Sequence, residues 1–245
     1  MANSFSFVLD ESNVYIWPLR TACSQHVTKQ FERILTPDEM NRAERFQFSH
    51  HRQSYTVVRG ALKFLIAGYI GASPAFVRLE YGKRGKPSIR EHFGLNFNTS
   101  HSGGLAVFAF ALNSEIGIDL ELIRPLPDMC DLATRFFCRE ETEELMDVPA
   151  DQRERAFFLC WTRKEAYIKA VGDGLYLALD SFRVTLHPDA PVAFVHLDHD
   201  RFAARAWSLH NVNVAPGYAA AVAYHSPTRI INLQPMLDPA LLLEL

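Results

Sequence analysis

Alternation of apolar and polar positions predicts several β-strands. Residues 14–17 are apolar and rich in β-formers, and a turn at 10–13 separates them from a similar run at 5–9. Four further strands are expected, at 76–81, 95–99, 104–112 and 116–122. Two-residue connections at 102–103 and 113–114 predict that the last three of these strands follow one another as hairpins.

Helical signals lie between the strand-rich regions. Thr36 can cap a helix, Pro37 suits the first helical position and Glu39 completes a capping-box spacing. A second helix is predicted over 53–70, with Gly71 ending it. Three more helices are expected further along, over 128–137, 139–146 and 151–171.

The same order of elements occurs twice: strand, helices, then a run of antiparallel strands. This order predicts an α+β protein made of two similar halves that meet near 112–115. We therefore divide the chain into an N-terminal half (1–112), a C-terminal half (113–225) and a proline-interrupted tail (226–245).

Composition narrows the functional classes. Hydrophobic residues make up 48% and charged residues 22% of the 245 positions, which is typical of a globular protein. The net charge of -3 weighs against a nucleic-acid partner. Four cysteines without a CxxC pair, an N-terminus unlike a signal peptide and no apolar run of about 18 residues predict a cytoplasmic protein without a membrane partner.

Two carboxylates share one face of the predicted strand 116–122. If this run is a strand, Gly117, Asp119 and Glu121 point away from its apolar face. Carboxylates two residues apart lie about 7 Å apart along a strand, so they can share one divalent cation. The alternative is a half-exposed strand whose charges are in water.

Trp161, Glu165 and Lys169 are spaced four apart in the predicted helix 151–171, so they share a face. A Glu–Lys pair at this spacing commonly adds only about 0.3–0.5 kcal/mol to helix stability. The rest of this helix is strongly apolar, which predicts that it is mostly buried. A buried carboxylate at Glu165 then needs a cation, either Lys169 or a metal ion. Lys164 fits either the surface or the site.

Other candidate residues could bind anions. Ser100 and His101 end a strand just before two glycines, where they could cap the turn or contact an anionic group. Two groups of basic residues are either solvated surface charges or part of a phosphate pocket. One group is Lys83, Arg84 and Lys86 in a glycine-rich loop. The other is Arg45, Arg52 and Arg59, which share one helix face if the helix is unbroken between them.

Five segments in this order resemble the Sfp-type 4'-phosphopantetheinyl transferases over about residues 36–174. They are K86-P, T99-S-H-S-G, G117-I-D-L-E, R135-F-F and W161-T-R-K-E-A-Y-I-K. The resemblance implies two halves related by a pseudo-twofold axis, with the active site in the cleft between them. It also implies transfer of phosphopantetheine from coenzyme A to a serine of an apo acyl or peptidyl carrier protein, with release of adenosine 3',5'-bisphosphate.

The resemblance further implies residue roles. Asp119, Glu121 and Glu165 would be ligands of Mg²⁺, with Mn²⁺ as a substitute, and Lys169 would contact the reacting phosphate. Glu165 or a metal-held water would take the serine proton. Residues implied in coenzyme A binding are Lys86, Pro87, Ser100 and His101, with Arg45, Arg52 and Arg59 as candidates for the 3'-phosphate or the adenine edge.

In this scheme the N-terminal half binds coenzyme A, while the C-terminal half carries the metal site and docks the carrier. One chain supplies both walls of the cleft, so a monomer with transient partners is expected. Two alternatives remain open from the residues: a metal-dependent nuclease or phosphodiesterase, and a non-catalytic coenzyme A-binding protein.

Overall fold

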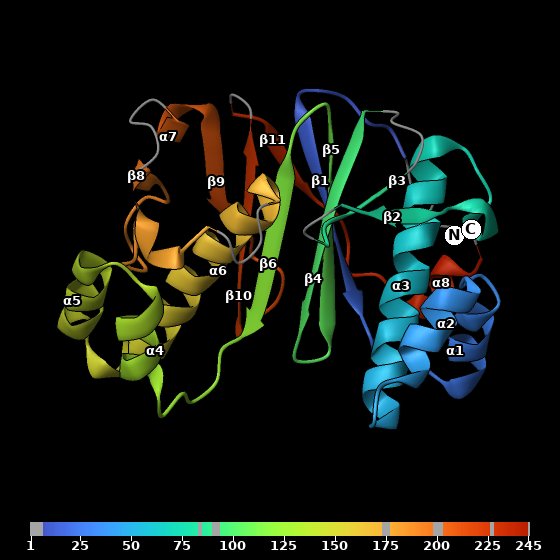
Figure 1. The fold of residues 1–245 in the computed structure, drawn as a ribbon, viewed down its shortest axis with the longest axis horizontal. Helices are drawn as coiled ribbons and strands as arrows, with labels where there is room; N and C mark the ends of the chain where they lie inside the picture. Colours follow the sequence, from blue (N-terminus) through green and yellow to red (C-terminus); the bar gives the residue numbers. More distant parts are fainter. Residues whose placement is uncertain are drawn as a thin grey trace.

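The computed structural model describes residues 7–82, 85–89, 94–172, 177–197, 203–225 and 228–244. It arranges them in four layers, in the order helix, sheet, sheet, helix (Figure 1). The α+β class, with small antiparallel sheets packed against helices, is therefore confirmed. No helix in the described ranges is long and apolar enough to cross a membrane.

The first sheet and its helices come mainly from the N-terminal half. β1 (Asn13–Arg20) pairs antiparallel with β5 (Leu105–Leu112), which pairs antiparallel with β4 (Leu95–Ser102). β2 (Leu79–Tyr81) and β3 (Pro87–Ile89) form a separate small hairpin. The helices of this half lie on its outer side (Figure 1) and are α1 (Gln25–Glu32), α2 (Pro37–Glu44) and α3 (Ser49–Ile70).

The second half repeats this arrangement. β6 (Ile116–Leu122) pairs antiparallel with β10 (Tyr218–His225), which pairs antiparallel with β9 (Trp207–Asn211). In each half, the last strand along the chain lies between the other two. The remaining elements are α4 (Met129–Phe136), α5 (Arg139–Asp147), α6 (Arg153–Val171), β7 (Phe182–Val184), β8 (Phe194–Leu197) and α7 (Ala203–Ala206).

Strand alternation divides the apolar side chains between cores. Val14 and Ile16 of β1 belong to the core between the two sheets, where Ile118 and Val222 pack from the other side. Trp17 and its neighbours on the other face of the first sheet pack with α3 in a second core. A third core lies between the second sheet and α6. The two halves are thus joined through an apolar interface between the sheets.

The helix signals at Thr36 and Gly71 are confirmed. Thr36 Oγ1 accepts a hydrogen bond from Glu39 N at 3.3 Å, and Glu39 Oε2 accepts one from Thr36 N at 2.9 Å. Gly71 ends α3 with a φ of 66°, a conformation that favours glycine.

The prediction of a separate tail is corrected by the structure. Within 226–245, β11 (Ile230–Leu233) pairs parallel with β1 and extends the first sheet, and α8 (Pro239–Leu242) follows it. Leu237 and Leu242 are buried in the core beneath α3. The chain end therefore belongs physically to the N-terminal half, because its apolar side chains complete that core.

Three local predictions also differ from the structure. Residues 7–9 are not a strand, and residues 5–6 lie outside the described ranges. The connection at 113–114 is not a hairpin, because β5 and β6 belong to different sheets. The helix α1 was not predicted, although Ser24 caps it in the usual way, accepting a hydrogen bond from Val27 N.

α6 lies unusually close to β6 because the side chains between them are small. Gly117 faces α6, and its cross-strand partner in β10 is Ala223. A Cβ atom on Gly117 would lie 2.1 Å from the carbonyl oxygen of Ala166 and 2.3 Å from the amide nitrogen of Ala170. Both atoms belong to the helix backbone, so they could not move aside without moving the helix.

We expect Gly117→Ala to lower the free energy of unfolding by about 1–3 kcal/mol, the usual penalty of overpacking. Gly82→Ala is the matched control, because among the described residues its Cβ would meet only Lys86 O at 3.8 Å. That control should stay within about 0.5 kcal/mol of the wild type in urea denaturation. Equal stability of the two variants would show that α6 can move away at no cost.

Candidate active site between the two halves

Lys169 of α6 contacts both neighbouring strands. Its Nζ lies 2.6 Å from Asp119 Oδ1 on β6 and 3.1 Å from Ser100 Oγ on β4. Asp119 is 4% exposed, and its Oδ2 is buried without a hydrogen-bond partner in the described part of the chain. An unpaired buried carboxylate oxygen is costly, so this atom marks a place where a cation or donor could bind.

Glu121 lies two residues after Asp119 on the same strand face. Its Oε2 accepts a hydrogen bond from Ser102 Oγ at 2.8 Å. Desolvation raises the pKa of Glu121, and the carboxylate of Asp119 raises it further, whereas Ser102, Arg124 and Lys169 oppose the rise. The site therefore disfavours negative charge until a cation enters.

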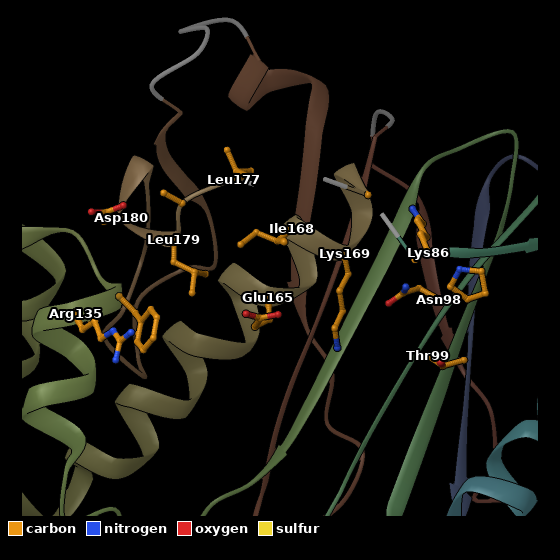
Figure 2. Close-up of a pocket in the computed structure, with 15 residues that line it drawn as sticks. Lys86, Asn98, Thr99, Arg135, Glu165, Ile168, Lys169, Leu177, Leu179 and Asp180 are labelled. Atoms are coloured by element: carbon orange, nitrogen blue, oxygen red, sulfur yellow. The ribbon is translucent and has the colours of Figure 1, made fainter. Parts of the chain in front are cut away.

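Glu165 lies one turn before Lys169. Figure 2 shows both side chains extending from α6 into a space, and Asn98 and Thr99 lie on the other side of that space. Desolvation raises the pKa of Glu165, Asp119 and Glu121 add to the rise, and Lys169 lowers it. The predicted shared face of this helix is thus observed, and Glu165 is held among other carboxylates.

Two adjoining cavities meet at these residues. The smaller, of about 400 Å³, is lined by Thr99, Ser100, His101, Asp119, Glu121, Trp161, Glu165 and Lys169. The larger, of about 480 Å³, shares Thr99, Glu165 and Lys169 with it. The larger cavity extends between Lys86 on one side and Ile168, Leu177 and Leu179 on the other (Figure 2). Pro87 and Phe136 also line it.

Lys86 joins the glycine-rich loop to the end of α6. Its Nζ donates to Ala170 O at 2.8 Å and lies 3.0 Å from Glu115 Oε2. Burial lowers the pKa of Lys86, and Glu115 opposes that change. Its ammonium therefore holds the two halves together at the cavity wall. The neighbouring candidates Lys83 and Arg84 lie outside the described residues.

His101 borders the smaller cavity. Desolvation lowers the pKa of His101, and electrostatic interactions with Lys169 and His51 lower it further. The neutral imidazole is therefore favoured near neutral pH, so this side chain would meet an anion as a hydrogen-bond donor.

The three candidate arginines do not share one helix face, because the helix is not continuous between them. α2 ends at Glu44 and α3 begins at Ser49, which leaves Arg45 in the connection. Arg45 instead lines a separate cavity with Tyr55 and Tyr81. Arg59 stacks over these same two rings, with its Cζ 5.7 Å and 5.8 Å from their centroids, whereas Arg52 is exposed.

Hard oxygen donors suit Mg²⁺, which takes one or two carboxylates together with water and phosphate oxygens. Asp119, Glu121 and Glu165 line one cavity, and Asp119 Oδ2 is free, so these residues fit such an ion in chemistry. Among the described residues, no three His, Cys, Asp or Glu side chains lie close enough to hold a metal ion as they stand. Holding an ion would therefore require the Glu165 side chain to move toward the two carboxylates of β6.

Two residues next to the site were not singled out from the sequence. Asn98 and Ser102 hydrogen-bond to β6. The sequence feature that could have indicated this role is that residues 96, 98, 100 and 102 of the strand are all polar. Lys164 belongs to neither alternative, surface or site, because it is fully buried. Its Nζ lies 2.7 Å from Glu141 Oε2 and donates to the carbonyl oxygens of Leu179 and Phe182.

Comparison with known proteins agrees with this arrangement. The profile of the 4'-phosphopantetheinyl transferase superfamily matches residues 115–223, and that of the 4'-phosphopantetheinyl transferase N-terminal region matches residues 22–113. The chain is 38% identical to the 4'-phosphopantetheinyl transferase HetI of Nostoc sp., over 89% of this chain and 90% of that protein. It is 30% identical to the 4'-phosphopantetheinyl transferase Sfp of Bacillus subtilis, over 83% and 88% respectively.

We expect Lys164→Met to destabilise the fold by about 3–5 kcal/mol, because it leaves the buried carboxylate of Glu141 without its cation. The double variant Lys164→Met/Glu141→Gln should recover part of this loss in urea denaturation. Arg139→Met, which breaks the exposed Arg139–Glu143 pair, should cost less than about 1 kcal/mol. Similar losses of unfolding free energy in Lys164→Met and Arg139→Met would contradict a structural role for Lys164.

The raised pKa of Glu165 predicts a pH-dependent stability. In metal-free buffer the folded state holds this proton above the ordinary value of 4.5, so stability falls as pH rises from there. Glutamine cannot ionise and escapes this penalty. The melting temperature of Glu165→Gln should therefore rise relative to the wild type between pH 4.5 and 7. Glu154→Gln, in the first turn of the same helix, is the control, and an equal change in both variants would contradict the assignment.

Proposed function

This chain belongs to the 4'-phosphopantetheinyl transferase superfamily, and we propose that it moves the phosphopantetheine arm of coenzyme A to a carrier-protein serine with Mg²⁺ held by Asp119, Glu121 and Glu165. The observation that carries the residue assignment is the meeting of these three carboxylates and Lys169 on one cavity between the halves. The free Oδ2 of Asp119 supports a cation there.

Lys169 is suited to bind the reacting pyrophosphate. Its ammonium already lies at the cavity, and its side chain is 28% exposed. A phosphate oxygen could replace Ser100 as one of its acceptors without removing Lys169 from Asp119. Charge develops on the phosphate oxygens during transfer, and a cation fixed beside them stabilises it. When bound, Mg²⁺ would supply further neutralisation of that charge.

The serine hydroxyl needs a base, and Glu165 is our candidate. Glu165 lies on the cavity where the pyrophosphate would bind, and a bound cation would keep its carboxylate ionised and able to accept a proton. Transfer joins the serine oxygen to the pyrophosphate phosphorus that carries the arm, and the bond to the bridging oxygen breaks. Adenosine 3',5'-bisphosphate leaves, and the serine proton passes to the Glu165 carboxylate.

Coenzyme A would lie across both cavities. Ser100 and His101 border the smaller one, where the His101 imidazole can donate to a phosphate oxygen. Lys86 and Pro87 form a wall of the larger one, whose apolar opposite wall suits the phosphopantetheine arm. Arg45 lines the cavity that also contains Tyr55 and Tyr81, and Arg59 lies over these two rings, so both are better placed than the exposed Arg52 to bind the 3'-phosphate.

The carrier would dock on the C-terminal half. Leu132 and Phe136 on α4 are only half-buried, whereas Met129 is buried in the core, so α4 keeps apolar surface beside the larger cavity. Both walls of the site come from one chain, which supports a monomer acting with transient carriers. We assign the protein to the cytoplasm because its four cysteines are free thiols, which is typical of a reducing compartment.

The transfer activity can be tested by mass. Incubation with coenzyme A, Mg²⁺ and an apo carrier protein should add one phosphopantetheine group to the carrier. We expect Glu165→Gln and Asp119→Asn to reduce the rate by about a hundredfold or more, because each removes a group that acts on the developing charge or proton. Glu154→Gln on the same helix should transfer at the wild-type rate.

Several outcomes would contradict the proposal. No mass gain over fatty-acid, polyketide and peptide-synthetase carriers would overturn transfer to these carriers. Full activity of both site variants would overturn the residue assignment alone. Mg²⁺-dependent cleavage of DNA without use of coenzyme A would favour the nuclease alternative, and binding of coenzyme A without turnover would favour a non-catalytic protein.

A further inference from the structure

β6 has a free edge beside the active site, and side chains of β4 cover it. β6 ends its sheet, with β10 on one side, and β4 lies along the other (Figure 1). Ile118 N donates to Asn98 Oδ1 at 3.0 Å, and Leu122 N donates to Ser102 Oγ at 3.2 Å. Side chains thus satisfy edge amides that a neighbouring strand would otherwise pair through its backbone.

The same β4 face also binds the carboxylates of β6. Ser100 Oγ donates to Asp119 Oδ1, and Ser102 Oγ donates to Glu121 Oε2, each at 2.8 Å. Residues 98, 100 and 102 are every second residue of β4, so one strand face supplies all four contacts. Each serine therefore holds one particular oxygen of one carboxylate.

The second oxygen of each carboxylate is left for another partner. Asp119 Oδ1 is occupied by both Ser100 and Lys169, whereas Oδ2 is buried and unpartnered. Glu121 Oε2 is held by Ser102 with Arg124 3.9 Å away, and within the described ranges Oε1 accepts no hydrogen bond. Each carboxylate thus offers a cation one oxygen rather than two.

We propose that Ser102, with Ser100, limits the carboxylates of β6 to one metal-binding oxygen each and thereby selects Mg²⁺ or Mn²⁺ over Ca²⁺. The inference rests on the proposed metal site. Mg²⁺ requires an octahedron with ligands at about 2.0–2.1 Å, which single oxygens and water can form. Ca²⁺ takes about six to eight oxygens and often binds both oxygens of one carboxylate. The serine hydrogen bonds would have to break before such a two-oxygen contact could form.

Ser102 is the better residue to test. Ser100 also contacts Lys169 and borders the substrate cavity, so its loss would have several effects. Ser102 bonds only to Glu121 Oε2 and Leu122 N among the described residues, which makes it a positioning residue that acts through Glu121. Groups that orient metal ligands in this way typically change metal affinity by about 10–100-fold when mutated.

The test measures metal binding rather than activity. Free Mn²⁺ is followed by its electron paramagnetic resonance signal while Mg²⁺ or Ca²⁺ competes for the protein, with and without coenzyme A. We expect Ser102→Ala to lower the ratio of Mg²⁺ to Ca²⁺ affinity by about tenfold. Ser102→Thr should keep the wild-type ratio and Ser102→Val should lose it, because these two differ only in hydroxyl against methyl.

Ser114→Ala is the matched control. Ser114 is a buried serine that donates to the backbone carbonyl of His225, away from the carboxylates of β6. An unchanged ratio in both Ser102→Ala and Ser102→Val, or an equal change in Ser114→Ala, would overturn the inference and leave the proposed function intact. A wild-type protein that binds no Mn²⁺ would overturn the proposed metal site and this inference with it.

Discussion

The close approach of α6 to β6 at Gly117 is the constraint on which the site depends. Only a glycine lets the helix backbone come this near the strand, since even a methyl group would overlap the backbone of Ala166 and Ala170. This approach places Lys169 within 2.6 Å of Asp119. A helix one side chain further out would leave Asp119 as an unpaired buried carboxylate, which is strongly unfavourable.

The seam between β4 and β6 fixes the other side of the site. Two backbone edges with regular pairing would leave no carboxylates or hydroxyls between them, so side-chain bridging is what allows polar groups at this depth. Asn98, Ser100 and Ser102 satisfy amides and carboxylates in one row. One oxygen of Asp119 stays unsatisfied, which is the usual signature of a place prepared for a ligand.

Local periodicity was enough to predict the faces of β6 and α6, because period-two and period-four spacing follow from backbone geometry alone. It could not predict that 226–245 returns to pair with β1, since that strand lies more than two hundred residues away in sequence. The seven-residue spacing of Arg45 and Arg52 was misleading because the chain leaves the helix between them. The role of Ser102 could not be predicted from the sequence, because it depends on contact with Glu121 from the other half.

Two lysines on α6 show why the setting of a charge decides its use. An ammonium group has three donors. Lys164 directs its donors to Glu141 and two carbonyl oxygens and is fully enclosed, so exchanging any partner would expose a buried charge. Lys169 has one short contact to Asp119, a weaker one to Ser100 and a 3.4 Å contact to Ile118 O, with part of its side chain in solvent. It can therefore exchange an acceptor for a phosphate oxygen, which Lys164 cannot.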